Sequence, residues 1–176
     1  METIAEVKLG EAPALMLSPE DRLDIDALML VTEDDTPVDN FLSEKQQRLL
    51  TEPLYSSWSG PGEGGPFLAA ANVGLFASVH EPPVVPDVFL SLEVTAPQDW
   101  WAKRGRSYFF WEFGKAPEVV IEIVSNREGG ETGSKMRTYA RLGISYYAIY
   151  DPLEQAQKGV LRIYELRPGR AYVETT

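Results

Sequence analysis

The chain has no cysteine and only one histidine among its 176 residues. The absence of cysteine excludes disulfides, thiolate zinc sites and cysteine nucleophiles. A single histidine, His80, argues against a histidine-rich metal site and against a histidine-based catalytic triad. Any catalysis must therefore rest on carboxylates, lysine, arginine, tyrosine or serine.

Long apolar runs and basic charge are also scarce. No apolar run approaches the ~20 residues of a membrane span, and the N-terminus lacks the basic start and continuous apolar segment of a secretory signal. These absences predict a cytoplasmic protein with no membrane span. The net charge of −11 points away from a broad nucleic-acid-binding surface, which is normally basic. A local patch is still allowed by a small basic cluster that lies among aromatic residues: Lys103, Arg104, Arg106 and Lys115.

An acid inside an apolar run is the most informative feature that the sequence does contain. Glu122 lies within residues 119–124, and every other residue of this run is β-branched. Such a run, which follows Pro117 and precedes Ser125, predicts a strand covered on both faces. A buried carboxylate there costs several kcal/mol unless a cation or hydrogen-bond donors meet it.

A second acid, Asp87, follows Pro86 in a similar strand-like run over residues 84–94. Taken alone, Asp87 is more simply interpreted as the cap of a turn. Glu122 alone is as compatible with a buried lysine or arginine partner as with a metal. Two carboxylates on two successive core strands together favour a metal site.

The remaining pattern predicts one α/β domain without internal repeats. Ser43 and Gln46 have the spacing of a capping box that begins a helix, and Pro53 should kink or end it. Gly143 should close a second helix over residues 134–142. The expected strands are 67–79 and 84–94 as a hairpin, 119–124, 144–150, and an antiparallel extension formed by 160–166 and the last residues.

Aromatic residues are concentrated in the connection over residues 96–116. Trp100 and Trp101 are suited either to stacking on nucleobases or to a packed or self-associating surface. The overall acidity favours the second interpretation, and a homodimer is accordingly a candidate assembly.

The order of elements, with Pro-Asp on one core strand and Glu on the next, resembles the PD-(D/E)XK nuclease superfamily. Four segments, VVPDVFLSLEV, WEFGKAPEVVIEIVSN, GSKMRTYARLGISYYAIYDP and LRIYELRPGRAYVE, are similar to the Uma-two family of restriction-endonuclease-like proteins. The resemblance implies a restriction-endonuclease-like α/β domain over residues 39–176, with an N-terminal lead-in over 1–38. The implied core is αβββαβ, in which helices flank a central mixed β-sheet.

The same resemblance implies a set of site residues. Asp87 and Glu122 fall on the family's metal-binding carboxylates, and Lys135 falls on a family lysine. Glu44 falls where related nucleases often carry an acid, which makes it an additional candidate. The backbone carbonyl of Ile123 is a further candidate metal ligand.

This set implies Mg²⁺- or Mn²⁺-dependent cleavage of DNA. One departure is that Val124 stands where an E-x-K motif has its lysine, so that a catalytic lysine must come from the helix as Lys135. An ordinary exposed lysine explains Lys135 equally well, and a solvated first-turn acid explains Glu44 better than a ligand does. The alternative function is a nuclease-fold module that binds a protein or nucleic-acid partner without cutting.

Overall fold

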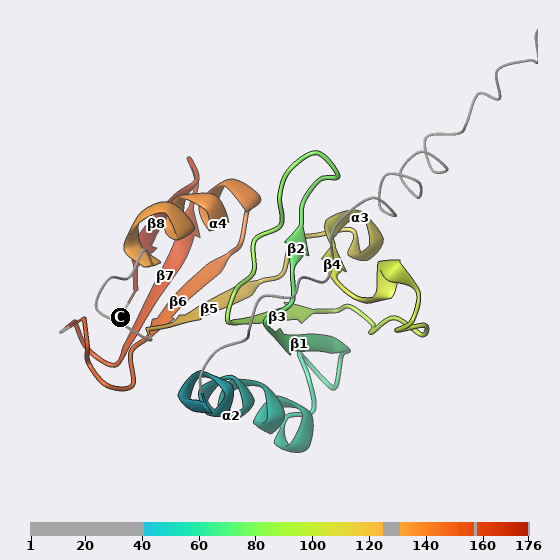
Figure 1. The fold of residues 1–176 in the computed structure, drawn as a ribbon, viewed down its shortest axis with the longest axis horizontal. Coiled ribbons are helices and arrows are strands. Elements are labelled where there is room, and N and C mark those ends of the chain that lie inside the picture. Colours follow the sequence, from blue (N-terminus) through green and yellow to red (C-terminus); the bar gives the residue numbers. More distant parts are fainter. Residues whose placement is uncertain (1–40, 125–130, 157, 176) are drawn as a thin grey trace, which may run out of the picture.

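The computed structural model describes residues 41–124, 131–156 and 158–175 (Figure 1). The strands are β1 (Phe67–Ala71), β2 (Leu75–Phe76), β3 (Val88–Leu92), β4 (Tyr108–Phe109), β5 (Val119–Ile123), β6 (Tyr146–Tyr150), β7 (Leu161–Arg167) and β8 (Ala171–Glu174). The helices are α2 (Phe41–Ser57), α3 (Phe110–Phe113) and α4 (Met136–Leu142), with a 3₁₀ turn η1 (Lys103–Gly105) and a π-helical turn η2 (Glu131–Lys135). The predicted lead-in over residues 1–38 lies outside the described residues.

The central sheet confirms the predicted fold class. Its six strands lie in the order β1-β3-β5-β6-β7-β8. Only β5 and β6 pair in parallel, and α4 lies in the crossover between them, as a parallel pair requires. The chain order α2, β1, β3, β5, α4, β6 is the expected αβββαβ core, and β7 and β8 form the expected antiparallel extension.

Helices cover the two faces of this sheet unequally. In Figure 1, α4 and the small β2–β4 pair lie on one side of the sheet, and α2 lies on the other. The main hydrophobic core is on the α4 side, where strand residues such as Val120, Tyr147 and Ile149 pack with Tyr139 of α4. The alternation of β5 therefore directs Val120, Glu122 and Val124 towards α4.

The beginning of α2 differs from the sequence prediction, and of the two effects predicted for Pro53, a kink or an end of the helix, the end is wrong. The helix already includes Phe41, so Ser43 lies inside it as a buried residue and is not an N-cap. The helix also continues past Pro53 to Ser57. Tertiary contacts explain the continuation, because the Tyr55 ring stacks on Phe67 with the ring centroids 5.1 Å apart.

The predicted strand over residues 67–79 is in fact two strands in two sheets. β1 ends at Ala71, and Asn72 has a positive φ of 53°, which asparagine tolerates better than most residues. The chain then leaves the central sheet, and β2 pairs in parallel with β4. The hairpin relationship survives in part, because β1 pairs antiparallel with β3 and Leu75 bridges Val84.

The core on the α4 side should account for much of the stability. The Ile149 side chain is fully buried, and its replacement by alanine should lower the free energy of unfolding by roughly 2–5 kcal/mol. Urea unfolding followed by circular dichroism measures this change. Leu161→Ala is the matched control on β7, because Leu161 is 51% exposed. Equal losses in the two variants would contradict this location of the core.

No helix among the described residues is both long enough and apolar enough to cross a membrane.

Candidate active site

Asp87 and Glu122 face each other across neighbouring strands. In the antiparallel β3–β5 pair, Val88 is opposite Ile121 and Phe89 is opposite Val120. Continuing this register by one residue sets Asp87, which immediately precedes β3, opposite Glu122. Strand alternation then directs both carboxylates to the face that α4 covers.

A backbone hydrogen bond holds the Asp87 carboxylate. Its Oδ2 accepts a hydrogen bond from the Ile123 N–H at 2.6 Å. Within the described part of the chain, its other oxygen, Oδ1, accepts no hydrogen bond. The N–H and C=O of one strand residue point to the same side of the strand. The Ile123 carbonyl therefore points to the β3 side of β5, as its N–H does. The Asp87 carboxylate and the Ile123 carbonyl are thus on the same side of β5.

The Glu122 carboxylate is almost completely buried, with 1% of the residue exposed. Two donors from the helical segment after β5 meet it. The Lys135 Nζ donates to Oε2 at 2.6 Å, and the Tyr139 hydroxyl donates to Oε1 at 2.5 Å. The cost of burying this charge is therefore offset by one ion pair and one hydrogen bond.

Burial raises the pKa of Glu122 from 4.5 to about 7. The Lys135 charge and the hydrogen bonds from Lys135 and Tyr139 lower this pKa, whereas the negative charge of Asp87 raises it. Burial is also the main reason why the pKa of Tyr139 is raised, followed by the adjacent Glu122 charge. Tyr139 consequently remains a protonated hydrogen-bond donor at any ordinary pH.

Lys135 reaches Glu122 from the helical segment and not from the strand. It is the last residue of η2. α4 follows directly and ends at Leu142, before Gly143, which has a left-handed φ of 81°. The Lys135 side chain is 43% exposed, so its ammonium group meets both the buried carboxylate and the solvent. Val124, at the E-x-K lysine position, is a buried core residue.

Glu44 has a different environment from Asp87, Glu122 and Lys135. It is in the first turn of α2, and its half-exposed side chain pairs with Arg48 of the same helix at 3.2 Å. No contact within the described part of the chain joins Glu44 to Asp87, Glu122 or Lys135.

The oxygen atoms of this site fit a hard divalent cation with few protein ligands. Among the described residues there is no group of three or more histidine, aspartate or glutamate side chains that could hold a metal. Mg²⁺ commonly uses only one or two carboxylates, with waters and substrate oxygens completing its shell. A carboxylate has about four lone-pair sites, so Asp87 and Glu122 keep acceptor capacity after their protein hydrogen bonds. The Ile123 carbonyl can add a third oxygen.

Tyr139 is the site residue that the sequence reasoning did not single out. Its hydroxyl orients Glu122 and satisfies one of the two buried carboxylate oxygens. The sequence feature that could have indicated Tyr139 is its position four residues after Lys135, because residues four apart lie on one face of a helix. Sequence alone could not show that this face is turned towards Glu122.

A comparison with protein-family models matches residues 33–176 to Uma2, a family described as "Putative restriction endonuclease". A comparison with curated proteins gives no match. The family match covers most of the chain and includes Asp87, Glu122 and Lys135. This chain belongs to the Uma2 family.

Proposed function

We propose that this chain is a cytoplasmic endonuclease that hydrolyses DNA phosphodiester bonds with Mg²⁺, or Mn²⁺ in its place. One observation carries the proposal: two carboxylates of neighbouring strands share one face of the sheet, and the Lys135 ammonium lies 2.6 Å from one of them. Membership of the Uma2 family supports a nuclease-like reaction.

Asp87, Glu122 and the Ile123 carbonyl would hold the cation in this proposal. A bound divalent cation polarises the phosphate and lowers the pKa of an attacking water. The chain's own contribution is to fix the carboxylates. The Ile123 N–H orients Asp87, and the Tyr139 hydroxyl orients Glu122, which is almost completely buried.

Lys135 would act on the substrate side of the site. Its Nζ has one contact with Glu122, and its 43% exposure leaves it accessible to a phosphate that arrives from solvent. An ammonium group in that position offsets the negative charge that grows on the phosphate oxygens in the transition state. The same ammonium group could donate a hydrogen bond to the oxygen of the attacking water and so favour its ionisation to hydroxide.

The second candidate function is a module that binds a protein or nucleic-acid partner without cutting. The hydrogen bonds of Glu122 are the observation that supports it. Both of its oxygens accept hydrogen bonds from protein donors, and the ion pair with Lys135 already neutralises the charge that a cation needs. In this alternative, Asp87 and Glu122 would be parts of a structural network.

Cleavage assays separate the two functions. Highly purified wild type should nick and linearise supercoiled plasmid in Mg²⁺ or Mn²⁺ but not in EDTA. Asp87→Ala protein purified in parallel should be inactive, and cleavage that persists in it would point to a contaminating nuclease. Absence of wild-type cleavage on double-stranded DNA, single-stranded DNA and RNA would favour the binding module. Light scattering on the same samples tests whether the protein forms the homodimer that the sequence analysis gives as a candidate assembly.

Metal affinity should depend on pH through Glu122. The pKa of this carboxyl is about 7, and the cation binds its ionised form, so binding below pH 7 must displace a proton. The apparent association constant for Mn²⁺ should therefore fall about tenfold for each pH unit below 7 and level off above pH 8. Calorimetry between pH 5.5 and 8.5, in buffers of different ionisation enthalpy, measures the affinity and the protons released. An affinity that falls only below pH 5 would contradict the raised pKa.

A further inference from the structure

A cavity of about 420 Å³ lies beside the edge strand β1, next to the connection that follows β3. Its lining is rich in aromatic rings: Tyr55, Phe89, Trp100, Tyr108 and Phe113. Tyr108 and Phe113 stack with their centroids 4.2 Å apart and their planes within 6° of parallel. The volume falls within the roughly 300–1,000 Å³ of small-molecule sites. The size and the aromatic lining of the cavity suit a flat, largely apolar group.

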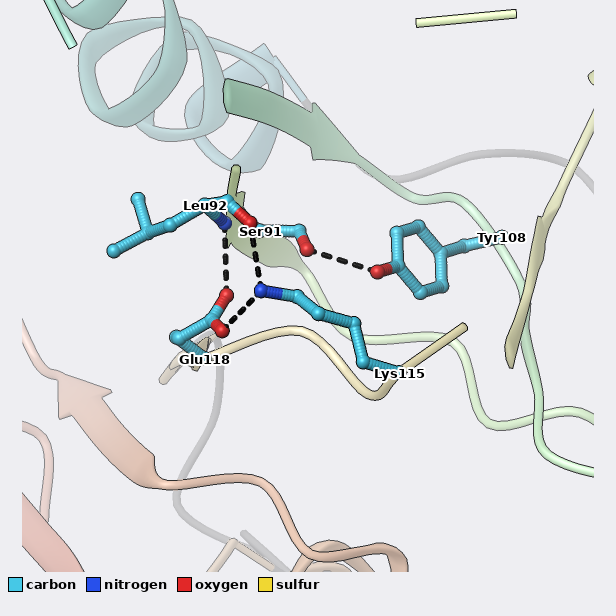
Figure 2. A network of polar contacts seen from close by, with 5 residues as sticks. All are labelled: Ser91, Leu92, Tyr108, Lys115 and Glu118. Carbon is cyan, nitrogen blue, oxygen red and sulfur yellow. Dashed lines mark hydrogen bonds and ion pairs between the residues drawn. The ribbon is translucent and has the colours of Figure 1, made fainter. Parts of the chain in front are cut away.

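One hydrogen bond holds the Tyr108 side chain, and a second polar network lies beside it (Figure 2). Its hydroxyl shares a 2.8 Å hydrogen bond with the buried Ser91 hydroxyl. Beside it, Lys115 donates to the Leu92 carbonyl at 2.6 Å and pairs with Glu118, which in turn accepts the Leu92 N–H at 2.8 Å. Lys115, one of the four residues of the predicted basic cluster, is thus engaged in an ion pair with Glu118.

The segment that borders the cavity is basic in an otherwise acidic chain. Residues 97–107 carry three basic side chains and one acidic side chain, whereas the whole chain has a net charge of −11. Arg106 lines the cavity, and its Nε donates to the Trp101 carbonyl at 3.2 Å. The acidic side chain, Asp99, directs Oδ1 to the Trp101 and Ala102 N–H groups. Aromatic rings beside basic side chains suit a ligand with planar bases and phosphates.

The cavity is also close to the candidate active site. Phe89, in its wall, is two residues after Asp87 and on the same face of the sheet. At about 3.3 Å per strand residue, the two positions are roughly 7 Å apart.

We propose that this cavity binds an unstacked nucleobase of the DNA strand whose phosphate meets Asp87 and Glu122. The inference rests on the proposed nuclease function and deepens it, because it specifies a substrate with a single-stranded stretch near the cleaved bond. Trp100, 56% exposed, supplies the stacking surface, and Arg106 contacts the adjacent phosphate. Trp101 is 86% exposed and is outside the cavity lining, so it does not stack on the base.

Binding in EDTA tests the inference without requiring catalysis. Fluorescence anisotropy with a labelled oligothymidylate should show that Trp100→Ala weakens binding about 5- to 150-fold, the effect of losing one base-stacking side chain. Trp101→Ala is the matched control and should change binding less than twofold. Trp100→Phe should recover most of the affinity. An abasic strand with the same number of phosphates should bind wild type about as weakly as oligothymidylate binds Trp100→Ala.

Several results would overturn the nucleobase pocket. One is that wild type fails to bind oligothymidylate, and another is that the two tryptophan variants are folded and lose the same amount of affinity. A third is that wild type binds the abasic strand as tightly as it binds oligothymidylate. Light scattering that shows a dimer in wild type and a monomer in Trp100→Ala, with DNA binding unchanged, would assign the cavity to a second copy. Failure of the nuclease proposal looks different, since wild type would then bind as expected but would not cleave.

Discussion

The Asp87→Asn protein is expected to lose metal-dependent DNA cleavage while it remains folded. Asparagine keeps the shape of the side chain and an oxygen that can accept the Ile123 N–H, which Asp87 binds at 2.6 Å. The substitution removes the charge of one of the two carboxylates proposed to hold the cation. The cleavage rate should therefore fall by more than the ~10²–10³-fold typical of losing one preorganised electrostatic contact.

Initial rates of plasmid nicking in Mg²⁺ and calorimetric titration with Mn²⁺ measure this loss. Glu52→Gln is the control for removal of a carboxylate, because Glu52 lies on α2 with a 66% exposed side chain paired to Arg48. Its rate and Mn²⁺ affinity should match wild type. Asp87→Asn should unfold in urea within about 1–2 kcal/mol of wild type, since a charge-assisted hydrogen bond becomes a neutral one. Wild-type Mn²⁺ affinity in Asp87→Asn would remove the metal site from the proposal.

Most of the central sheet follows from local sequence signals. The β-branched run around Glu122, the Pro-Asp before β3 and the Gly143 helix end each predict their element because the local preference and the final packing agree. That Asp87 and Glu122 face each other depends on one further feature, the antiparallel pairing of β3 with β5. The resemblance to a nuclease family supplied the order of strands that makes this pairing the expected one.

The errors arise where tertiary contacts or single backbone angles decide the structure. The run over residues 67–79 contains Asn72 and Gly74, which are turn residues, but its apolar content concealed the break at Asn72. α2 continues past Pro53 because the Tyr55 ring packs on Phe67. This contact joins residues that are far apart in the sequence, so local signals do not predict it. The role of Tyr139 depends on the rotation of α4 over the sheet, and the sequence does not specify that rotation.

Lys135→Met is expected to reduce cleavage by roughly 10²–10³-fold, the effect of removing one preorganised electrostatic contact. Methionine keeps the aliphatic length of the side chain but removes the ammonium that lies 2.6 Å from Glu122 Oε2. Plasmid cleavage at saturating Mg²⁺ measures the effect, and Mn²⁺ calorimetry at pH 9 should still detect metal binding. Lys45→Met on the exposed surface of α2 is the matched control and should retain wild-type activity.

The pH at which this variant is assayed separates two roles for Lys135. The Lys135 charge lowers the pKa of Glu122, so its removal should move that pKa further above 7 and weaken metal binding at neutral pH. If the lysine only keeps Glu122 ionised, the deficit should largely disappear at pH 9, where the carboxyl ionises again. If the ammonium also stabilises charge on the phosphate, the deficit should persist at pH 9. The 43% exposure of Lys135 favours the second result, because a group that served Glu122 alone would not need access to solvent. Wild-type rates for Lys135→Met at both pH values would contradict either role.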